Sequence, residues 1–335
     1  MNTARYDPLK LMAGVLKGER RALARAITLV ESTRPEHRQL AIELLETLPR
    51  ADGTFRIGIT GVPGAGKSTF IEAFGQHLIS QGHKVAVLSV DPTSAISGGS
   101  ILGDKTRMEQ LSRNPGAFIR PSPAGATLGG VARRTRETLN LCEAAGFDVV
   151  IIETVGVGQS ETSVASMTDL FMLLLVPGGG DDLQGIKRGI VELADLVLVN
   201  KADGDLLAAA TRAASDYAHA FRLLRPRSNH WRVKVTTCSA LQGQGIAECW
   251  DLASEFRSAL TDAGEFDRNR ARQARAWLWD EVSATLMARF QASPALSNRL
   301  ESFESEVQSG ALNPSVAAER LVHEFVTGAA SNDEQ

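Results

Sequence analysis

Short, almost continuously apolar runs alternate with longer amphipathic stretches through the middle of the chain, from about Phe55 to Leu260. Runs of this kind are typical of strands in a parallel sheet that helices cover on both faces. The pattern predicts strands at 55–60, 84–90, 148–154, 169–176, 195–200 and 233–239. It predicts helices between them at 67–80, 131–145, 186–194 and 206–223. We therefore expect an α/β core with a doubly wound, mainly parallel sheet.

Both ends of the chain follow a different pattern, in which apolar residues recur at helical spacing. Before residue 50, Pro35 separates two such stretches. After about residue 264, the pattern predicts three helices bounded by Pro or Gly, at 266–290, 294–309 and 314–327. The sequence thus predicts N-terminal helices over 1–50, an α/β domain over 51–262 and a C-terminal helical arm over 263–335.

The composition narrows the class of protein. Hydrophobic residues make up 43% of the chain, charged residues 22%, and the net charge is −3. A chain built mainly to bind nucleic acid or acidic membranes would be strongly basic. No apolar run approaches the ~18 residues of a membrane span, and the N-terminus does not have the pattern of a secretory signal. Three cysteines without a close pair argue against a disulfide framework. We expect a cytoplasmic protein that binds neither nucleic acid nor membranes.

The strongest motif follows the first predicted strand. Residues 61–68 read Gly-Val-Pro-Gly-Ala-Gly-Lys-Ser and match the phosphate-binding pattern G-x-x-x-x-G-K-[S/T]. Glycine lets backbone N–H groups approach a phosphate, and the N-terminus of the following helix adds partial positive charge. Lys67 is expected to reach the β and γ oxygens of a nucleoside triphosphate, and Ser68 to bind Mg²⁺. The expected nucleotide contacts are Gly61, Val62, Pro63, Gly64, Ala65, Gly66, Lys67, Ser68 and Thr69.

A second motif indicates which base is bound. Asn-Lys-Ala-Asp at 200–203 follows a predicted strand, at the edge where α/β sheets bind ligands. A carboxylate at Asp203 can accept hydrogen bonds from N1 and N2 of guanine, whereas adenine would leave it desolvated and unpaired. Lys201 can lie over the base, and Asn200 can fasten this loop to the 61–68 loop. The segment after the last strand resembles the loop whose backbone contacts guanine O6 in GTPases: Ser239, Ala240 and Leu241.

Acidic residues at the ends of other strands are further candidates to bind Mg²⁺. Asp91 follows the strand at 84–90, Glu153 can hold a magnesium-bound water, and Asp104 lies in a polar loop. Because Mg²⁺ usually takes only one or two protein groups, these aspartates could instead cap helices or form turns. Gly156 would let a backbone N–H approach the γ-phosphate. The predicted catalytic residues are Lys67 and Glu153, and no side chain stands out as the group that orients the attacking water.

The order and form of these motifs resemble the SIMIBI class of P-loop GTPases. Asp-Pro-Thr follows one strand, and Glu-x-x-Gly takes the place of the usual Asp-x-x-Gly. Within this class, the segments that resemble the MeaB/ArgK-type family are 61–69, 90–108, 120–130, 151–161 and 176–190. The resemblance extends from the N-terminal helices to the C-terminal ones. Members of this family are GTPase chaperones of adenosylcobalamin-dependent methylmalonyl-CoA mutase.

The resemblance implies three segments that respond to the bound nucleotide, at about 97–108, 153–161 and 178–188. The third is implied to signal to the mutase through Asp181, Asp182, Gln184 and Lys187. The implied ligands are GTP or GDP and Mg²⁺, and the implied partners are the mutase and the cobalamin adenosyltransferase. Adenosylcobalamin would be held by the partner, because the sequence has no Asp-x-His-x-x-Gly cobalamin motif.

The predicted helix at 266–290 carries a basic run: Arg268, Arg270, Arg272 and Arg275. The simplest interpretation is a solvated helix face. The alternative is an arm that buries its apolar side chains against a second copy of the chain: Phe266, Trp277, Leu278, Val282, Leu286 and Phe290. The resemblance implies such a homodimer, made through the C-terminal helices.

The resemblance implies a GTP-binding and GTP-hydrolysing chaperone that controls cofactor loading onto the mutase and protects that enzyme. Because no water-orienting group is evident, we expect slow intrinsic hydrolysis that the partner stimulates. Two alternatives stay open at this point. A nickel-type metallochaperone GTPase would show a His-rich tract or a Cys–His pair, and a P-loop kinase would use ATP, against which Asp203 argues.

Overall fold

The computed structural model describes residues 6–49, 53–90, 108–121, 128–154, 160–178 and 188–332. The chain divides into two compact units, Met1–Arg270 and Ala271–Gln335. The division into three segments that the sequence suggests stays a prediction.

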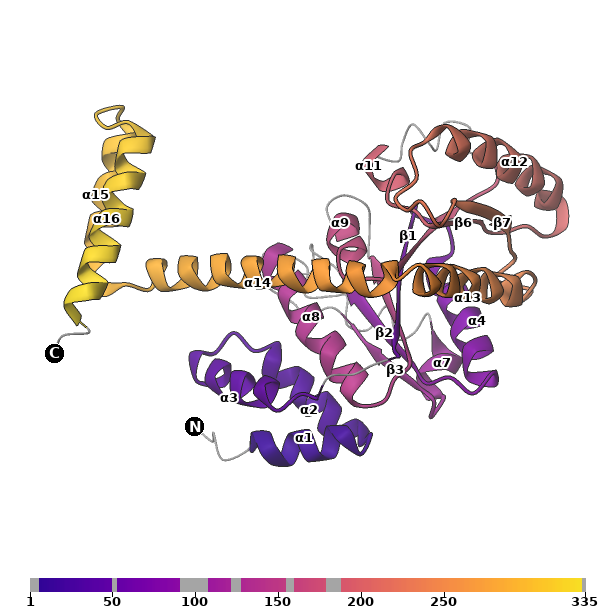
Figure 1. Cartoon of the computed structure of the whole chain (residues 1–335), viewed down its shortest axis with the longest axis horizontal. Helices are drawn as coiled ribbons and strands as arrows, with labels where there is room; N and C mark the ends of the chain where they lie inside the picture. The colour runs from indigo at the N-terminus through magenta and orange to yellow at the C-terminus, as the bar shows by residue number, and fades with distance from the viewer. Residues whose placement is uncertain are drawn as a thin grey trace. The chain divides into compact units, whose positions relative to one another are not determined.

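The first unit is built on a sheet whose strand pairs are all parallel (Figure 1). Within the described residues its seven strands lie in the order β3-β2-β4-β1-β5-β6-β7. They are β1 (Phe55–Gly61), β2 (Val85–Val90), β3 (Ala117–Arg120), β4 (Val149–Thr154), β5 (Leu170–Leu175), β6 (Leu196–Val199) and β7 (Lys234–Thr237). All residues of β1, β2, β4, β5 and β6 are buried, as their apolar runs indicate. The predicted α/β class is confirmed, and the sheet is parallel throughout.

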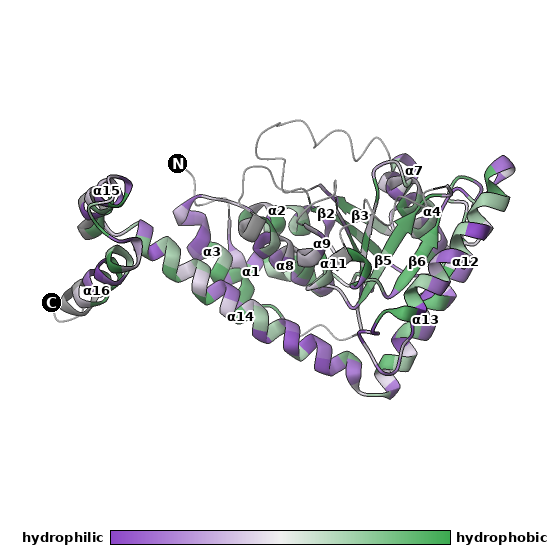
Figure 2. Ribbon diagram, turned by 90° about the horizontal axis from the view of Figure 1, so that it is seen from above, coloured by the Kyte–Doolittle hydropathy of each residue, from purple (hydrophilic) through white to green (hydrophobic). Residues whose placement is uncertain are grey.

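Helices cover both faces of the sheet, and Figure 2 shows the strands as the more hydrophobic layer between them. One face packs against α4 (Lys67–Ser80), α7 (Glu109–Arg113) and α13 (Ile246–Asp262), which share an apolar core with the strands. The other face packs against α8 (Leu128–Ala144) and α9 (Ser160–Ala165). The crossovers to β6 and β7 contain α11 (Arg188–Val191) and α12 (Leu207–Leu223). A helix was expected at 186–194. Among the described residues of this range, 188–194, only the four residues of α11 are helical.

Three helices precede the sheet, where the sequence predicts helical structure. They are α1 (Pro8–Leu16), α2 (Arg20–Val30) and α3 (Pro35–Glu46), and they pack on one another and on α8. Two ion pairs join this layer to the sheet unit. Arg120 of β3 pairs with Glu31, and Arg38 of α3 lies 2.7 Å from Glu137 of α8. The N-terminal helices therefore form a third layer over α8 rather than a separate body.

The chain leaves the first unit through α14 (Glu265–Gln291). Phe266 packs against Phe55 in the core of the sheet unit, with ring centroids 6.5 Å apart. The guanidinium of Arg270 lies 2.7 Å from the buried carboxylate of Asp169 and also donates to the Thr54 carbonyl. Phe266 is therefore half-buried within its own chain, and its contact with a second copy stays a prediction.

The second unit contains the rest of α14 with α15 (Pro294–Gln308) and α16 (Pro314–Asn332). The last two helices pack on each other, and Arg299 pairs with Glu324 between them at 2.7 Å. Exposed apolar side chains are frequent on this unit: Leu278, Trp279, Leu286, Met287, Val316, Val322 and Val326. Among the described helices, none has the length and apolar character to cross a membrane.

Candidate nucleotide site

The loop between β1 and α4 has the backbone that the phosphate-binding motif requires. Gly64 has φ +78° and Gly66 has φ +82°, a region that favours glycine. Gly66 is also the residue before the first turn of α4, whose N–H groups point out of the helix end. A Cβ on Gly61 would lie 2.3 Å from the Leu174 carbonyl oxygen of β5. The loop therefore tolerates no side chain at Gly61, and it presents the N-terminus of α4 to an anion.

Lys67 begins α4 and its side chain turns back across the loop. Its Nζ donates a hydrogen bond to the Gly61 carbonyl oxygen at 2.8 Å. Burial lowers the pKa of Lys67, and the negative charges of Glu153 and Glu161 oppose that effect. The ammonium group is thus placed over the loop that would hold the phosphates, where its positive charge suits the β and γ oxygens.

Two buried carboxylates accompany Lys67. Glu153, at the end of β4, is 3% exposed and accepts a hydrogen bond from the Ser89 hydroxyl at 2.8 Å. Glu161 lies in the first turn of α9 and is 1% exposed. The sequence pointed to Glu153 but not to Glu161 as an individual site residue. Its burial next to Lys67 is a tertiary effect, although it falls inside the 151–161 segment that resembles the family.

Asn200 joins the two loops that were expected to hold the phosphates and the base. Its Nδ2 donates to the Ala65 carbonyl oxygen at 2.8 Å, and its Oδ1 accepts from the Ala240 N–H at 3.0 Å. The Cys238 thiol lies 3.7 Å from the same Oδ1. Asn200 is itself 2% exposed. One buried side chain therefore connects loops that are far apart in the sequence.

Asp203 lies opposite the loop that follows β7. Its carboxylate accepts a hydrogen bond from the Ser239 hydroxyl, whose oxygen in turn accepts from the Gln242 N–H. A Cβ on Gly245, which has φ +73°, would lie 2.7 Å from the Thr237 carbonyl, so this turn also requires glycine. These contacts fix one carboxylate oxygen of Asp203 and leave hydrogen-bonding capacity for a ligand. Ser239 was expected to offer its backbone, and its side chain positions the aspartate as well.

Lys201 and Leu241 flank this carboxylate on the surface. Lys201 has φ +61° and an exposed side chain, and Leu241 is 81% exposed. Their contacts with the base stay predictions. Several predicted residues lie outside the described residues: Asp91, Asp104, Gly156, Asp181, Asp182, Gln184 and Lys187.

The described residues include only two members of the predicted magnesium set, Ser68 in the first turn of α4 and Glu153. In that part of the chain no group of three or more His, Cys, Asp or Glu side chains could hold a metal ion. A hydroxyl and a carboxylate are hard oxygen donors, and Mg²⁺ usually completes its shell with phosphate and water. These two residues therefore fit Mg²⁺ that arrives with a nucleotide.

Comparisons with known proteins agree with this geometry. The family described as "Methylmalonyl Co-A mutase-associated GTPase MeaB" matches residues 23–295. A probable GTPase of Mycobacterium tuberculosis is 54% identical over 313 residues, covering 93% of each chain. The mouse protein named "Methylmalonic aciduria type A homolog, mitochondrial" is 50% identical, covering 94% of this chain and 79% of its own length.

Among solved structures, that of a protein named LAO/AO transport system kinase superposes with a TM-score of 0.74 at 39% identity. The match covers 98% of this chain and 99% of that one. Because the match includes residues of both units and the sequence identity is 39%, it supports common descent as well as a common fold. The chain belongs to the MeaB family of P-loop GTPases, and its activity is the hydrolysis of GTP.

Proposed function

We propose that this GTPase is a chaperone of adenosylcobalamin-dependent methylmalonyl-CoA mutase, which controls loading of the cofactor onto that enzyme and protects it from inactivation. The observation that carries the proposal is the family match over residues 23–295, because the description of that family names the mutase. The name of the mouse relative, which refers to methylmalonic aciduria, supports the same partner.

In the proposed site, phosphate binding, charge stabilisation and base recognition are assigned to different segments, and Lys67 takes part in the first two. The 61–68 loop and the N-terminus of α4 hold the phosphates, and Lys67 balances the negative charge that moves onto them during hydrolysis. Mg²⁺ bound through Ser68 and Glu153 would supply further charge stabilisation. Asp203 accepts hydrogen bonds from the guanine edge, while Ser239 holds it in position. Asn200 keeps the two halves of the site together.

Slow intrinsic hydrolysis is part of the proposal. The described residues around Lys67 offer buried carboxylates, and none of them is an evident water-orienting side chain. We therefore propose that the mutase completes or orders the site and so raises the turnover of GTP. Asp91, Asp104 and Gly156 belong to the proposed site, and the signal to the mutase would pass through the segment with Asp181, Asp182, Gln184 and Lys187.

We also propose that the chain works as a homodimer through its C-terminal helices. The exposed apolar side chains of α14 support this, since Leu278 and Trp279 are 59% and 61% exposed and Leu286 is 54% exposed. Adenosylcobalamin would be bound by the mutase and delivered by the cobalamin adenosyltransferase, which we include as a further partner. The protein would act in the cytoplasm.

The proposal is tested by measuring Mg²⁺-dependent turnover of GTP and ATP, with and without stoichiometric mutase. We expect selective GTP turnover that rises when the mutase is added. Lys67→Ala should abolish turnover under both conditions. Turnover of GTP that is indifferent to the mutase would overturn the activation by this partner. Preferential turnover of ATP would overturn the role of Asp203 and favour a kinase.

The base assignment has a sharper test. Guanine carries a 2-amino group, which needs a hydrogen-bond acceptor from the protein. Xanthine carries an oxygen at the same position, which needs a hydrogen-bond donor. Asp203→Asn supplies an amide donor at this position and keeps an oxygen for the Ser239 hydroxyl. We expect this variant to lose GTP turnover and to gain turnover of xanthosine triphosphate. Unchanged preference for GTP would contradict the contact.

A further inference from the structure

A pocket of about 700 Å³ lies at the opposite edge of the sheet from the nucleotide loops. Its wall includes Ala194, just before β6, and Val233 and Lys234, where β7 begins. Asn200 and Cys238, which belong to the nucleotide site, follow the other ends of the same two strands. At about 3.3 Å per residue, four-residue strands separate the two places by roughly 13 Å. The pocket is therefore distinct from the nucleotide site.

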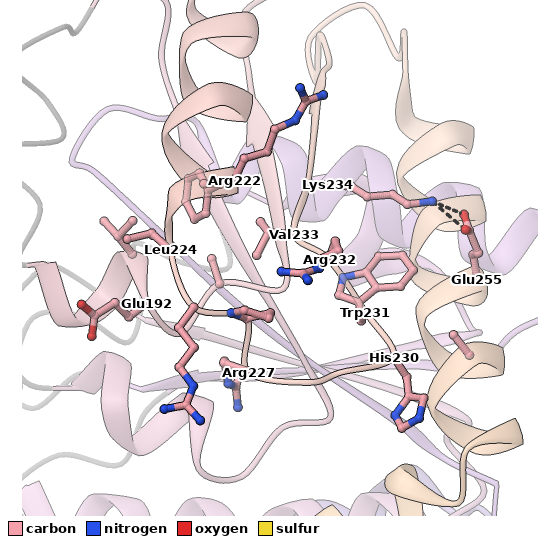
Figure 3. A pocket seen from close by; sticks show the side chains of 16 residues that line it. Glu192, Arg222, Leu224, Arg227, His230, Trp231, Arg232, Val233, Lys234 and Glu255 are labelled. Carbon is pink, nitrogen blue, oxygen red and sulfur yellow. Dashed lines mark hydrogen bonds and ion pairs between the residues drawn. The ribbon is translucent and has the colours of Figure 1, made fainter.

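The inner wall of this pocket is fixed by packing and hydrogen bonds (Figure 3). Trp231 is buried, its Nε1 donates to the Asp195 carbonyl oxygen at 2.8 Å, and its ring packs edge-on against Phe256. Lys234 lies 4.9 Å from the centre of the Trp231 ring and donates to both carboxylate oxygens of Glu255 at 2.6 Å. Since the indole is already covered in this way, it is a wall of the pocket and not a stacking platform for a base.

The pocket is strongly basic in a chain whose net charge is −3. Five cationic side chains line it: Arg222, Arg225, Arg227, Arg232 and Lys234. Among the described residues, two carboxylates line the same space, Glu192 and Glu255. Although the net charge of the chain is negative, this cluster of cations creates a local positive potential that attracts anions.

Only part of this charge is balanced by the protein. Arg227 donates to the Leu193 carbonyl at 2.7 Å and to Asp195 at 3.0 Å, and Lys234 is paired with Glu255. The side chains of Arg222, Arg225 and Arg232 are exposed and make no hydrogen bond, ion pair or ring contact with any residue that the structure describes. Three guanidinium groups around one hollow are therefore available to a ligand.

We propose that this pocket binds a small organic anion that carries phosphate groups. Guanidinium groups bind phosphate oxygens through paired N–H donors, and several of them around one hollow suit more than one phosphate. A volume of about 700 Å³ lies within the roughly 300–1,000 Å³ of small-molecule sites. Apolar side chains between the arginines, including Phe221, Leu224 and Val233, suit the carbon skeleton of such a ligand. A hollow of this size with a fixed inner wall favours a small molecule over an extended acidic peptide.

Inorganic pyrophosphate is the probe for this site. It is titrated calorimetrically into the full chain saturated with GDP, without Mg²⁺ and at about 150 mM salt, so that GDP occupies the 61–68 loop and weak surface binding is screened. We expect saturable binding with a dissociation constant below about 1 mM. The triple variant R222Q/R225Q/R232Q should bind at least about 10-fold more weakly.

A matched control changes three other exposed arginines, one in each of α2, α12 and α16, that make no hydrogen bond or ion pair with a described residue: Arg21, Arg212 and Arg320. The variant R21Q/R212Q/R320Q has the same net charge as the pocket variant and should bind pyrophosphate as the wild type does. Both variants should keep their GTP turnover, since none of these residues belongs to the nucleotide site. An equal loss of pyrophosphate affinity in both variants would mean that binding depends only on the net charge of the protein, and it would overturn the proposal.

Two other results would also overturn the proposal. One is no saturable binding of pyrophosphate by the wild type, as expected if the arginines face an acidic protein segment. The other is unchanged binding by the pocket variant. The proposal does not depend on the nucleotide site. If GDP fails to bind, that failure counts against the site around Asp203. The pocket is then still tested in a Lys67→Ala background, in which the 61–68 loop lacks its ammonium group.

Discussion

Asn200→Ala removes the side chain that connects the phosphate loop to the base loop. Two hydrogen bonds of ordinary length are lost, to the Ala65 carbonyl at 2.8 Å and from the Ala240 N–H at 3.0 Å. Each such bond contributes about 0.5–1.5 kcal/mol, so the free energy of unfolding should fall by about 1–3 kcal/mol. The upper part of this range is expected because Ala65 and Ala240 are buried and their backbone groups stay without a partner.

The stability of the nucleotide-free protein is the decisive quantity, because it separates a structural connection from direct contact with GTP. It is measured by urea unfolding followed by circular dichroism. We expect a lower midpoint for Asn200→Ala without nucleotide, and at least about tenfold weaker GTP binding. Asn229→Ala makes the same substitution at an exposed position, where the side chain has no hydrogen bond to any described residue, and should change stability by less than about 0.5 kcal/mol.

Asn200→Asp sharpens the comparison, since it keeps the acceptor for the Ala240 N–H and replaces the donor by a carboxylate facing the Ala65 carbonyl. It should destabilise the nucleotide-free protein at least as much as the alanine variant. The reasoning is refuted if Asn200→Ala unfolds at the wild-type urea concentration in the absence of nucleotide, whatever happens to GTP binding.

Three further predictions concern the sheet unit. Gly61→Ala should lower the free energy of unfolding by about 1–3 kcal/mol in the same urea assay, because its Cβ would lie 2.3 Å from a backbone oxygen of β5. The control Gly189→Ala, whose Cβ would have nothing within 4 Å, should be nearly neutral. Burial raises the pKa of Asp195 from 3.8 to about 6, so the folded chain holds this proton more tightly than the unfolded chain. Stability should then fall by up to about 3 kcal/mol as the pH rises from 3.8 to about 6, and Asp195→Asn should remove this part of the slope; an unchanged slope would contradict the assignment. Arg270→Ala leaves a buried carboxylate without its ion pair and should cost about 3 kcal/mol in a thermal or urea transition, while Arg113→Ala in an exposed pair should cost less than about 1 kcal/mol.

Much of the fold follows from local pattern. Fully buried strands such as β4 and β5 read as apolar runs in the sequence, and the structure places them within one or two residues of the predicted bounds. The edge strand β3 was not predicted, and its last residue is Arg120, whose side chain pairs with Glu31 of the N-terminal layer. Its apolar run is only three residues long, Ala117–Ile119, which is too short to mark a strand without knowledge of its pairing with β2.

The candidate site divides in the same way. The 61–68 loop and the Asn200 connection follow from motifs whose chemistry fixes their spacing. Glu161 and the Ser239 side chain were missed in their observed roles, because their importance arises from burial and from a neighbour distant in sequence. The 222–234 pocket was missed although its five cationic side chains lie within 13 consecutive residues, because the sequence alone does not show that this segment lines one hollow.

The hydrogen bonds of Asn200 have a consequence for how the protein is made. They join residues 135 and 40 positions apart in the sequence, so the phosphate loop is held in place only after β6 and the loop behind β7 have been synthesised. Domains emerge from the ribosome N-terminus first. A nascent chain that ends before Ala240 carries the complete 61–68 motif without the support that shapes its nucleotide site. GTP binding should therefore appear late in translation, when roughly the first 260 residues, including α13, are free to pack.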